Sequence, residues 1–528
     1  MSAVVEPTCG ESARETSNRF LARVNGFWLL ITLLSLVAAG KVIQADSMDP
    51  DAFWHLRVAD QLAGDGIRPL VDSISFASLK TPWTPYSWLA ELFMRAVWNL
   101  GGFQLATLIT ALCSAMIVLV TASSPPPLEG GGGGRGPGRT FDDQGLIESD
   151  STLEPLPLTP RSRGGGKELS ITLLTANAAF FTLPFISFRP VTFALLIFAI
   201  IVALLSHDRA APSKRTWLIV PLTALMTNMH LYALLVPILL LATTAGAFFD
   251  DRKQFARYAL LTFATAVAAC CTPMLGGAIT TALRYNAVDP MVAANYITEM
   301  RPFYSGGIGK VSLALFIALL TMCIIRRRTL QITDWLWLAM ATLLLFRLGR
   351  FSPVFAILSM PTFAKAFPPL EGKALERGIV KLAMLAIIAI SLLNFLPSLV
   401  DRDFDRWLNR NTPSYPTAAA QFIDANITPR TGHLINEFNW GGYLAWRLGD
   451  RWQVLMDGRT QLYAPAFWNA THLGTPATRL ELLKTITADA AVVPASDSCL
   501  AKPLEQLGWK TVYRDDLAIV MTPDSLSR

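Results

Sequence analysis

The feature that most constrains this chain is a series of apolar runs, most of them close to the length at which a helix crosses a membrane. A spanning helix needs about 20 mostly apolar residues. Only 16% of the residues are charged, whereas soluble proteins carry about a quarter. Lipid is therefore the expected solvent for a polytopic α-helical protein with about eleven spans. The runs lie at 24–43, 103–121, 169–187, 190–206, 215–229, 231–249, 257–272, 311–325, 333–346, 351–367 and 379–397.

Lysine and arginine residues indicate the orientation of these spans. They gather before the first span and after the fourth, sixth and eighth, and they flank the tenth and eleventh. With eleven spans all of these clusters fall on one side, which the positive-inside rule assigns to the cytoplasm. We therefore predict a multi-pass protein of a bacterial inner (plasma) membrane, with a cytoplasmic N-terminus and an extracytoplasmic C-terminal domain.

Composition divides the chain into five segments. One of them, 122–168, is rich in Gly and Pro, cannot bury enough apolar area to fold, and is predicted to be a disordered cytoplasmic insertion. Its Arg-Gly run could contact nucleic acid or anionic lipid, but a tolerated linker is the simpler interpretation, and we expect no nucleic-acid partner. The other segments are 1–23, the N-terminus; 24–121, the first spans with an outer loop at 44–102; 169–397, the remaining bundle; and 398–528, the C-terminal domain.

Strands alternate with helices after residue 398, which predicts a small α/β domain with one sheet. The expected strands lie at 433–438, 452–457 and 488–494, and 509–515 and 517–522 form a closing β-pair. The expected helices lie at 413–427, 440–448, 465–473, 476–486 and 500–508.

Four polar residues mark this C-terminal domain. Turn and helix-cap chemistry is the plainer explanation for them. Contact with carbohydrate is the alternative, because Trp440 and Tyr443 lie beside them in the sequence. The four residues are Asn436, Asn439, Asp457 and Arg459.

Ionisable residues also gather at the outer edge of the predicted bundle, where they are costly and usually functional. Arginines on this side run against the positive-inside bias, so each needs a local partner such as a carboxylate or a phosphate. Asp49, Asp51 and His55 are candidate catalytic residues, because two carboxylates and a histidine begin one helix at the membrane surface. The candidates for binding substrate or phosphate are Arg189, His230, Glu299, Arg301, Arg347 and Arg350.

These candidates also have purely structural explanations. Asp49 and Pro50 are the residue types of an N-cap and of a first helical position. Asp51 and His55 are one helical turn apart and could pair with each other. The remaining alternatives are a packing role for His230, nonspecific contact with lipid headgroups for Arg347 and Arg350, and the cap of a tight turn for Arg189.

The run 87–98 has its apolar residues at helical spacing and is predicted to lie along the membrane surface. Glu91 on this run is expected to be a solvated or paired residue rather than a catalyst. Neighbouring Trp and Tyr residues fit an interfacial belt.

The order of these features resembles the GT-C superfamily of membrane glycosyltransferases. More closely, DPDAFWHLRVADQLAGDGIRPLVDSISF and WTPYSWLAELF are similar to a group of bacterial GT-C-like membrane proteins, mostly without assigned function. FRP at 188–190, NMH at 228–230 and ITEMRPF at 297–303 match this group as well, as do NEFNWGGYLAWRL and VLMDGRTQLY near the C-terminus. The resemblance spans nearly the whole chain apart from the insertion.

The resemblance implies a glycosyltransferase that moves a sugar from a polyprenyl-phosphate carrier to an extracytoplasmic acceptor, an unidentified glycan, lipid or protein. Asp49 or Asp51 would accept the proton of the acceptor hydroxyl. Arg347, Arg350 and Arg189 would stabilise the lipid phosphate that leaves.

The resemblance also suggests a divalent cation as cofactor, since some members use one and others do not. His55 would then orient a carboxylate or join the metal site. Two other functions stay open. A transporter or flippase for lipid-linked saccharides would favour broken helices at mid-membrane and paired halves, whereas here the polar residues crowd one end. The third function is non-catalytic assembly of envelope polysaccharide through the C-terminal domain.

Overall fold

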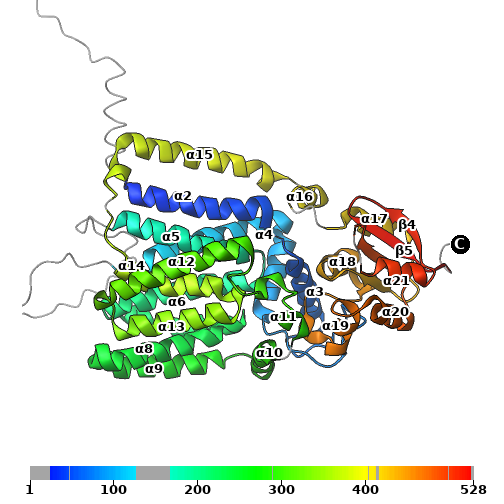
Figure 1. Ribbon diagram of the computed structural model, residues 1–528, viewed down its shortest axis with the longest axis horizontal. Coiled ribbons are helices and arrows are strands. Elements are labelled where there is room, and N and C mark those ends of the chain that lie inside the picture. The colour runs from blue at the N-terminus through cyan, green and yellow to red at the C-terminus, as the bar shows by residue number, and fades with distance from the viewer. Residues whose placement is uncertain are drawn as a thin grey trace, which may run out of the picture.

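The computed structural model consists of a long helical bundle with a smaller α/β domain at one end (Figure 1). The predicted N-terminus 1–23 and most of the predicted insertion 122–168 lie outside the residues that the structure describes. The described residues are 24–46, 48–126, 167–287, 289–370, 372–401, 403–411, 415–496 and 499–524.

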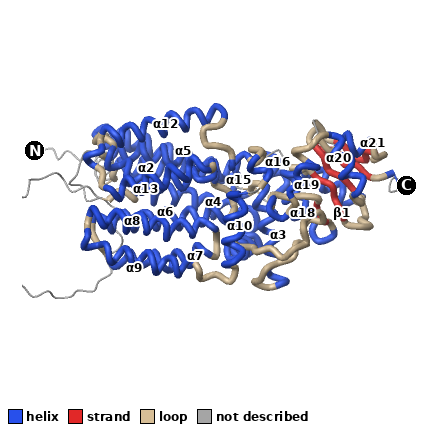
Figure 2. Tube along the Cα trace, turned by 60° about the horizontal axis from the view of Figure 1, so that its bottom comes forward, coloured by secondary structure: helices blue, strands red, loops and turns tan. Residues whose placement is uncertain are grey.

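The bundle helices run side by side along the long axis of the molecule (Figures 1 and 2). Each apolar run of the sequence overlaps one of them. They are α2 (Gly26–Lys41), α4 (Trp88–Ser123), α5 (Glu168–Thr182), α6 (Pro190–Ala210), α7 (Ile219–Thr227), α8 (Leu235–Asp250), α9 (Arg252–Ala269), α12 (Gly306–Ile325), α13 (Ile332–Arg347), α14 (Ser352–Ala366) and α15 (Gly378–Val400).

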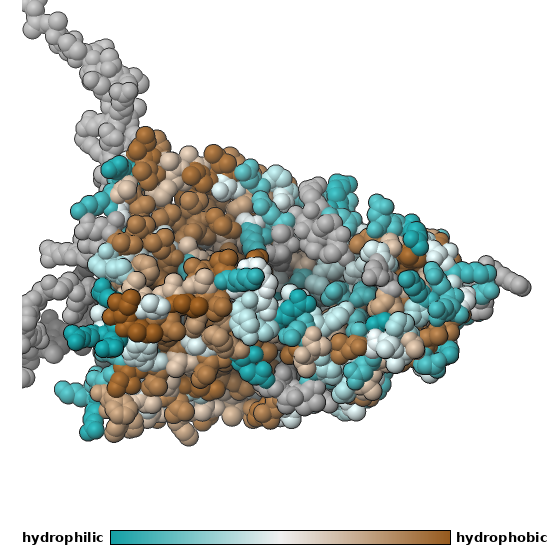
Figure 3. All heavy atoms as spheres, in the orientation of Figure 1, coloured by the Kyte–Doolittle hydropathy of each residue, from teal (hydrophilic) through white to brown (hydrophobic). Residues whose placement is uncertain are grey.

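The bundle has the surface of a membrane protein. On the face seen in Figure 3, most side chains of the bundle are hydrophobic, whereas most of those of the C-terminal domain are hydrophilic. The chain is therefore a multi-pass membrane protein. Among the described residues, seven helical stretches are long and apolar enough to cross a membrane. The count of eleven stays a prediction, because α7, α13 and α14 are shorter and α9 begins with basic residues.

Helix α4 contains both the predicted surface helix 87–98 and the predicted span 103–121, joined by a kink at Gly101 and Gly102. Gly102 has a φ of 56°, which favours glycine because a Cβ is strained there. The chain changes direction at this point. Met94, before the kink, packs in a core shared with the outer loop and the C-terminal domain, whereas Ile117, after it, packs in the bundle core.

The C-terminal domain contains a five-stranded sheet in the order β2-β1-β3-β5-β4. Strand β1 pairs in parallel with β2 and β3, and β5 pairs antiparallel with β3 and β4. The α/β prediction and the closing β-pair are confirmed. The strands are β1 (His433–Asn436), β2 (Gln453–Val454), β3 (Ala490–Pro494), β4 (Lys510–Arg514) and β5 (Ala518–Thr522); the helices include α17 (Thr417–Asn426), α18 (Gly441–Leu448), α19 (Pro465–Thr471), α20 (Pro476–Thr485) and α21 (Ala501–Gln506).

Residues 66–87, part of the predicted outer loop 44–102, tie this domain to the bundle. Val454 of β2 makes backbone hydrogen bonds with the loop in both directions. Asp72 of the loop and Asp457 share the guanidinium of Arg459, at 2.9 Å and 2.5 Å. All three side chains are buried, so the pairing excludes water. It holds the domain over the start of helix α3 (Pro50–Asp65), which lies between bundle and domain in Figure 1.

Candidate functional site

A pocket of about 500 Å³ lies between the start of α3, the start of α6 and the C-terminal domain. Its walls come from segments that are far apart in the sequence, and most of the outer-edge candidates meet there. The sequence candidates that line the pocket are Asp49, Asp51, His55, Arg189, His230, Glu299, Arg350 and Asn439.

Asp49 caps helix α3. Its Oδ1 accepts hydrogen bonds from the backbone N–H groups of Asp51 and Ala52, at 3.0 and 3.1 Å, and Pro50 occupies the first helical position. Its Oδ2 accepts a 2.6 Å hydrogen bond from the hydroxyl of Ser187. Asp49 therefore has the N-cap role that its sequence position suggests, and both of its carboxylate oxygens accept hydrogen bonds.

Arg189 lies among three carboxylates. Its Nε is 2.8 Å from Oδ2 of Asp49, its Nη1 is 3.0 Å from Oδ2 of Asp51, and its Nη2 is 3.3 Å from Oε2 of Glu299. Arg189 precedes Pro190 at the start of α6 with an extended backbone. The guanidinium is almost fully buried, so these carboxylates supply the negative charge that a buried cation requires.

One guanidinium shared by three carboxylates leaves their pKa values far apart. Burial raises the pKa of Asp51 to about 6; Arg189 opposes the shift, and the charges of Asp49 and Glu299 add to it. Burial also acts on Glu299, but Arg189 and Arg350 outweigh it and lower the pKa of Glu299 to about 2. Glu299 is therefore a permanent anion, whereas Asp51 exchanges its proton near neutral pH.

His55 pairs with Glu91 and not with Asp51, the partner that helical spacing allowed. The Nδ1 of His55 lies 2.9 Å from Oε1 of Glu91, and both side chains are buried. The expectation of pairing for Glu91 is confirmed, and a solvated position is wrong. Burial, with Arg189, lowers the pKa of His55 well below its ordinary value, so the ring that faces the pocket is neutral.

His230 is also neutral. Burial, followed by the charges of Arg350 and Arg189, lowers its pKa to about 3. Its Nδ1 accepts a 3.2 Å hydrogen bond from the backbone N–H of Tyr232, which leaves the hydrogen of the ring on Nε2. His230 can therefore donate a hydrogen bond inside the pocket without carrying charge.

The arginines of the outer edge separate into two groups. Arg350 lines the pocket, with its Nη2 3.9 Å from Oε1 of Glu299. Arg347 and Arg301 are exposed and lie outside the lining, and the Nε of Arg301 donates to the backbone oxygen of Asn295 at 2.7 Å. Helix α13 ends at Arg347, whereas Arg350 lies in the short 3-10 turn that follows, Gly349–Phe351.

The C-terminal domain supplies one wall of the pocket. Two glycines allow it to approach α3 closely: a Cβ on Gly458 would lie 2.4 Å from Oδ1 of Asp51, and one on Gly442 would lie 2.5 Å from the backbone oxygen of Pro50. Gln461 completes this wall. Gly458 and Gln461 fall within the VLMDGRTQLY motif, but the sequence carried no chemical signal for their role.

The other polar residues of this domain lie outside the pocket. Asn436 is buried and bridges β1 to the segment that follows β2: its Nδ2 donates to the backbone oxygen of Met456 at 2.9 Å, and its Oδ1 accepts from the N–H of Leu455 at 2.8 Å. Asp457 and Arg459 belong to the buried cluster with Asp72 described above. Trp440 and Tyr443, the aromatic residues expected beside a carbohydrate, are also buried.

Known proteins resemble this chain in structure and not in sequence. No family model and no curated protein matches it. Apo ArnT from Cupriavidus metallidurans matches with a TM-score of 0.52 and 13% identity, over 95% of this chain and 99% of ArnT. An Archaeoglobus fulgidus oligosaccharyltransferase, tethered with an acceptor peptide, matches with a TM-score of 0.50 and 10% identity, over 89% and 69%. Both are GT-C superfamily proteins. The chain has the GT-C fold.

The cofactor that the GT-C fold suggests, a divalent cation, does not fit the residues of this pocket. Its three carboxylates converge on the guanidinium of Arg189, which stands where a metal ion would have to bind. Within the described residues, no three His, Cys, Asp or Glu side chains are placed to hold a metal ion. The positive charge that these carboxylates contact is that of Arg189.

Proposed function

We propose that this protein is a membrane glycosyltransferase that moves a sugar from a polyprenyl-phosphate carrier to a hydroxyl group of an extracytoplasmic acceptor. One observation carries the proposal: a carboxylate with a pKa of about 6 and two arginines line the same pocket at the end of the bundle. The GT-C fold, which an oligosaccharyltransferase shares, supports the class of reaction.

Asp51 is the general base in this proposal, because burial places its pKa at about 6, whereas the carboxylate of Asp49 is held as the N-cap of α3. The side chain of Asp51 keeps about 30% of its surface exposed. Its Oδ1 accepts a 2.8 Å hydrogen bond from Nε1 of Trp54, which fixes the carboxylate. A base with a pKa just below the working pH is ionised and still accepts a proton well.

The reaction then proceeds by displacement at the anomeric carbon. Asp51 takes the proton of the acceptor hydroxyl, whose oxygen forms a bond to the anomeric carbon of the sugar. The bond between that carbon and the phosphate oxygen breaks, and its electrons leave with the lipid phosphate. Arg350 lines the pocket and binds this phosphate, while Glu299 and Arg189 fix the charge around it.

The test compares donor consumption by the purified full chain in lipid nanodiscs, using a radiolabelled polyprenyl-phosphate hexose. Asp51→Asn keeps the shape of the side chain but cannot accept a proton, so we expect turnover to disappear while a cooperative thermal unfolding transition remains, because Asp49 and Glu299 still pair with Arg189. The matched control is Asp60→Asn on the same helix, whose exposed carboxylate pairs with Arg95 outside the pocket.

Two outcomes contradict the proposal. In the first, Asp51→Asn consumes the donor as fast as wild type does. In the second, wild-type protein in proteoliposomes moves the lipid-linked sugar across the bilayer without consuming it, which identifies a flippase.

A further inference from the structure

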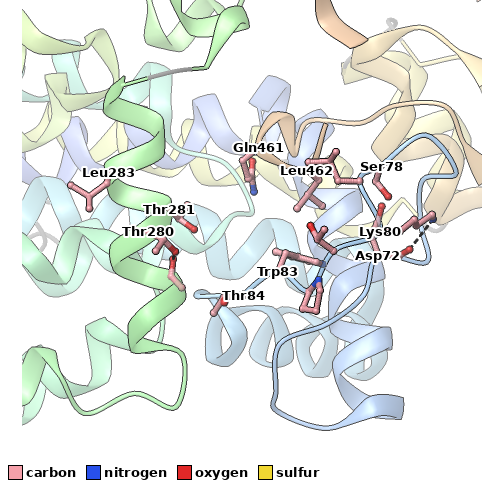
Figure 4. A pocket seen from close by; sticks show the side chains of 14 residues that line it. Asp72, Ser78, Lys80, Trp83, Thr84, Thr280, Thr281, Leu283, Gln461 and Leu462 are labelled. Atoms are coloured by element: carbon pink, nitrogen blue, oxygen red, sulfur yellow. Dashed lines mark hydrogen bonds between the residues drawn. The ribbon is translucent and has the colours of Figure 1, made fainter. Parts of the chain in front are cut away.

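A second cavity, of about 520 Å³, lies beside the first pocket. Figure 4 shows helix α10 (Leu275–Ala287) on one side of it, the outer loop with Trp83 and Thr84 on the other, and Gln461 between them. Helix and loop touch where a Cβ on Gly277 would lie 1.8 Å from Oγ1 of Thr84. The cavity volume falls within the about 300–1,000 Å³ of small-molecule sites.

The charged groups of this cavity are already engaged within its wall. The Nζ of Lys80 donates to the backbone oxygens of Asp72 and Ser75, at 2.9 and 2.5 Å. The carboxylate of Asp72 is paired with the buried Arg459. Lys80 is the one cation among the described lining residues, so the cavity lacks the arginine fork that phosphate or carboxylate recognition uses.

The groups that line the rest of the cavity are neutral. They include the hydroxyls of Thr81, Thr84 and Thr281, the amide of Gln461 and the indole of Trp83. The Nε1–H of Trp83 is buried and has no hydrogen-bond partner among the described residues. An aromatic face beside neutral donors and acceptors matches a sugar ring, which has apolar C–H faces and a rim of hydroxyl groups.

Gln461 lines this cavity and also the pocket of Asp51. We propose that the second cavity binds the acceptor, and that the acceptor is a neutral carbohydrate chain whose terminal hydroxyl passes Gln461 to reach Asp51. The role of this carbohydrate as the acceptor rests on the proposed function. The binding site itself rests on the neutral lining, the indole ring of Trp83 in that lining and the shared Gln461.

The test measures binding without donor, by isothermal titration calorimetry on the full chain in nanodiscs. The probes are maltohexaose, mannohexaose and chitohexaose, with hexagalacturonate as an acidic counterpart. We expect at least one neutral hexasaccharide to bind, and hexagalacturonate to bind more weakly. Thr281→Phe fills the cavity and should weaken binding at least tenfold; Ile279→Phe, on the exposed side of the same helix, should not. Trp83→Phe, which removes only the indole N–H and part of the ring, should also weaken it.

Three results overturn the inference: no neutral hexasaccharide binds, hexagalacturonate binds more tightly than all of them, or Thr281→Phe binds as wild type does. Because the measurement contains no donor, its outcome is independent of turnover. Oligosaccharide binding by a wild-type protein that consumes no lipid-linked sugar would remove the proposed function and leave the binding site standing.

Discussion

The Oδ2 of Asp51 lies 3.0 Å from Nη1 of Arg189, although 138 positions separate the two residues in the chain. Asp51 does not hold this cation alone, because Asp49 and Glu299 contact the same guanidinium. The positive charge of Arg189 is therefore shared among three carboxylates. Burial prevails at Asp51 and keeps its pKa at about 6, which is the property that makes this carboxylate suitable as a base.

Turnover is expected to rise with pH through a midpoint near 6, because Asp51 must lose its proton before it can accept another. Trp54→Phe removes the N–H that donates to the ionised carboxylate at 2.8 Å, so the midpoint should move to higher pH. The control is Trp88→Phe, whose Nε1 donates to Asn228 outside the pocket. The measurement is a pH–rate profile. An unmoved midpoint in Trp54→Phe would show that another group controls the profile.

Arg350→Gln should raise the KM for the lipid-linked donor by about 10- to 100-fold, because a charge-assisted hydrogen bond to phosphate is worth about 1.5–3 kcal/mol. Arg347→Gln is the matched control, since Arg347 is exposed three positions earlier and lies outside the lining. Initial rates at varied donor concentration separate the effects on KM and kcat. Equal effects of the two variants would indicate general attraction of anionic lipid instead of a phosphate site.

Arg459→Met should destabilise the protein by about 3–5 kcal/mol, because it leaves the carboxylates of Asp72 and Asp457 buried without their cation. Arg451→Met removes an exposed arginine that pairs with Asp424 at the surface, and it should change stability by less than about 1 kcal/mol. Thermal unfolding in detergent compares the two. Equal shifts in Tm would show that the buried cluster does not hold the outer loop to the C-terminal domain.

The sequence placed the right charges at one end of the bundle, but it did not reveal which of them meet. Asp49, Asp51, Arg189 and Glu299 stand out in the sequence because ionisable groups at a membrane edge are costly and therefore need partners. Arg347 and Arg350 have the same sequence interpretation, as two arginines between the same pair of predicted spans. The helix ends at Arg347, and this boundary separates them.

The burial of Glu91 could not be predicted from the sequence. Its helical run is amphipathic, which suggested a solvated face, and only the packing of α3 against α4 buries its carboxylate beside His55. The C-terminal sheet was more predictable, because alternating strands and helices have a local signal in the sequence. The roles of Gly442 and Gly458 could not be predicted, because their close approach to α3 depends on how the C-terminal domain is docked.

Turnover is expected to be insensitive to EDTA, because Arg189 provides the positive charge that three carboxylates would otherwise take from a metal ion. Arg189→Ala removes that cation. Turnover should fall by about 100-fold or more, and Asp49, Asp51 and Glu299 should then bind Mn²⁺, since carboxylate oxygens suit this ion. Electron paramagnetic resonance of added Mn²⁺ reports binding without reference to activity. Loss of wild-type turnover in EDTA, with recovery on adding a divalent cation, would show that the carboxylates exchange Arg189 for a metal during the reaction. Tight Mn²⁺ binding in Arg189→Ala alone would show that one side chain decides between the two kinds of cation.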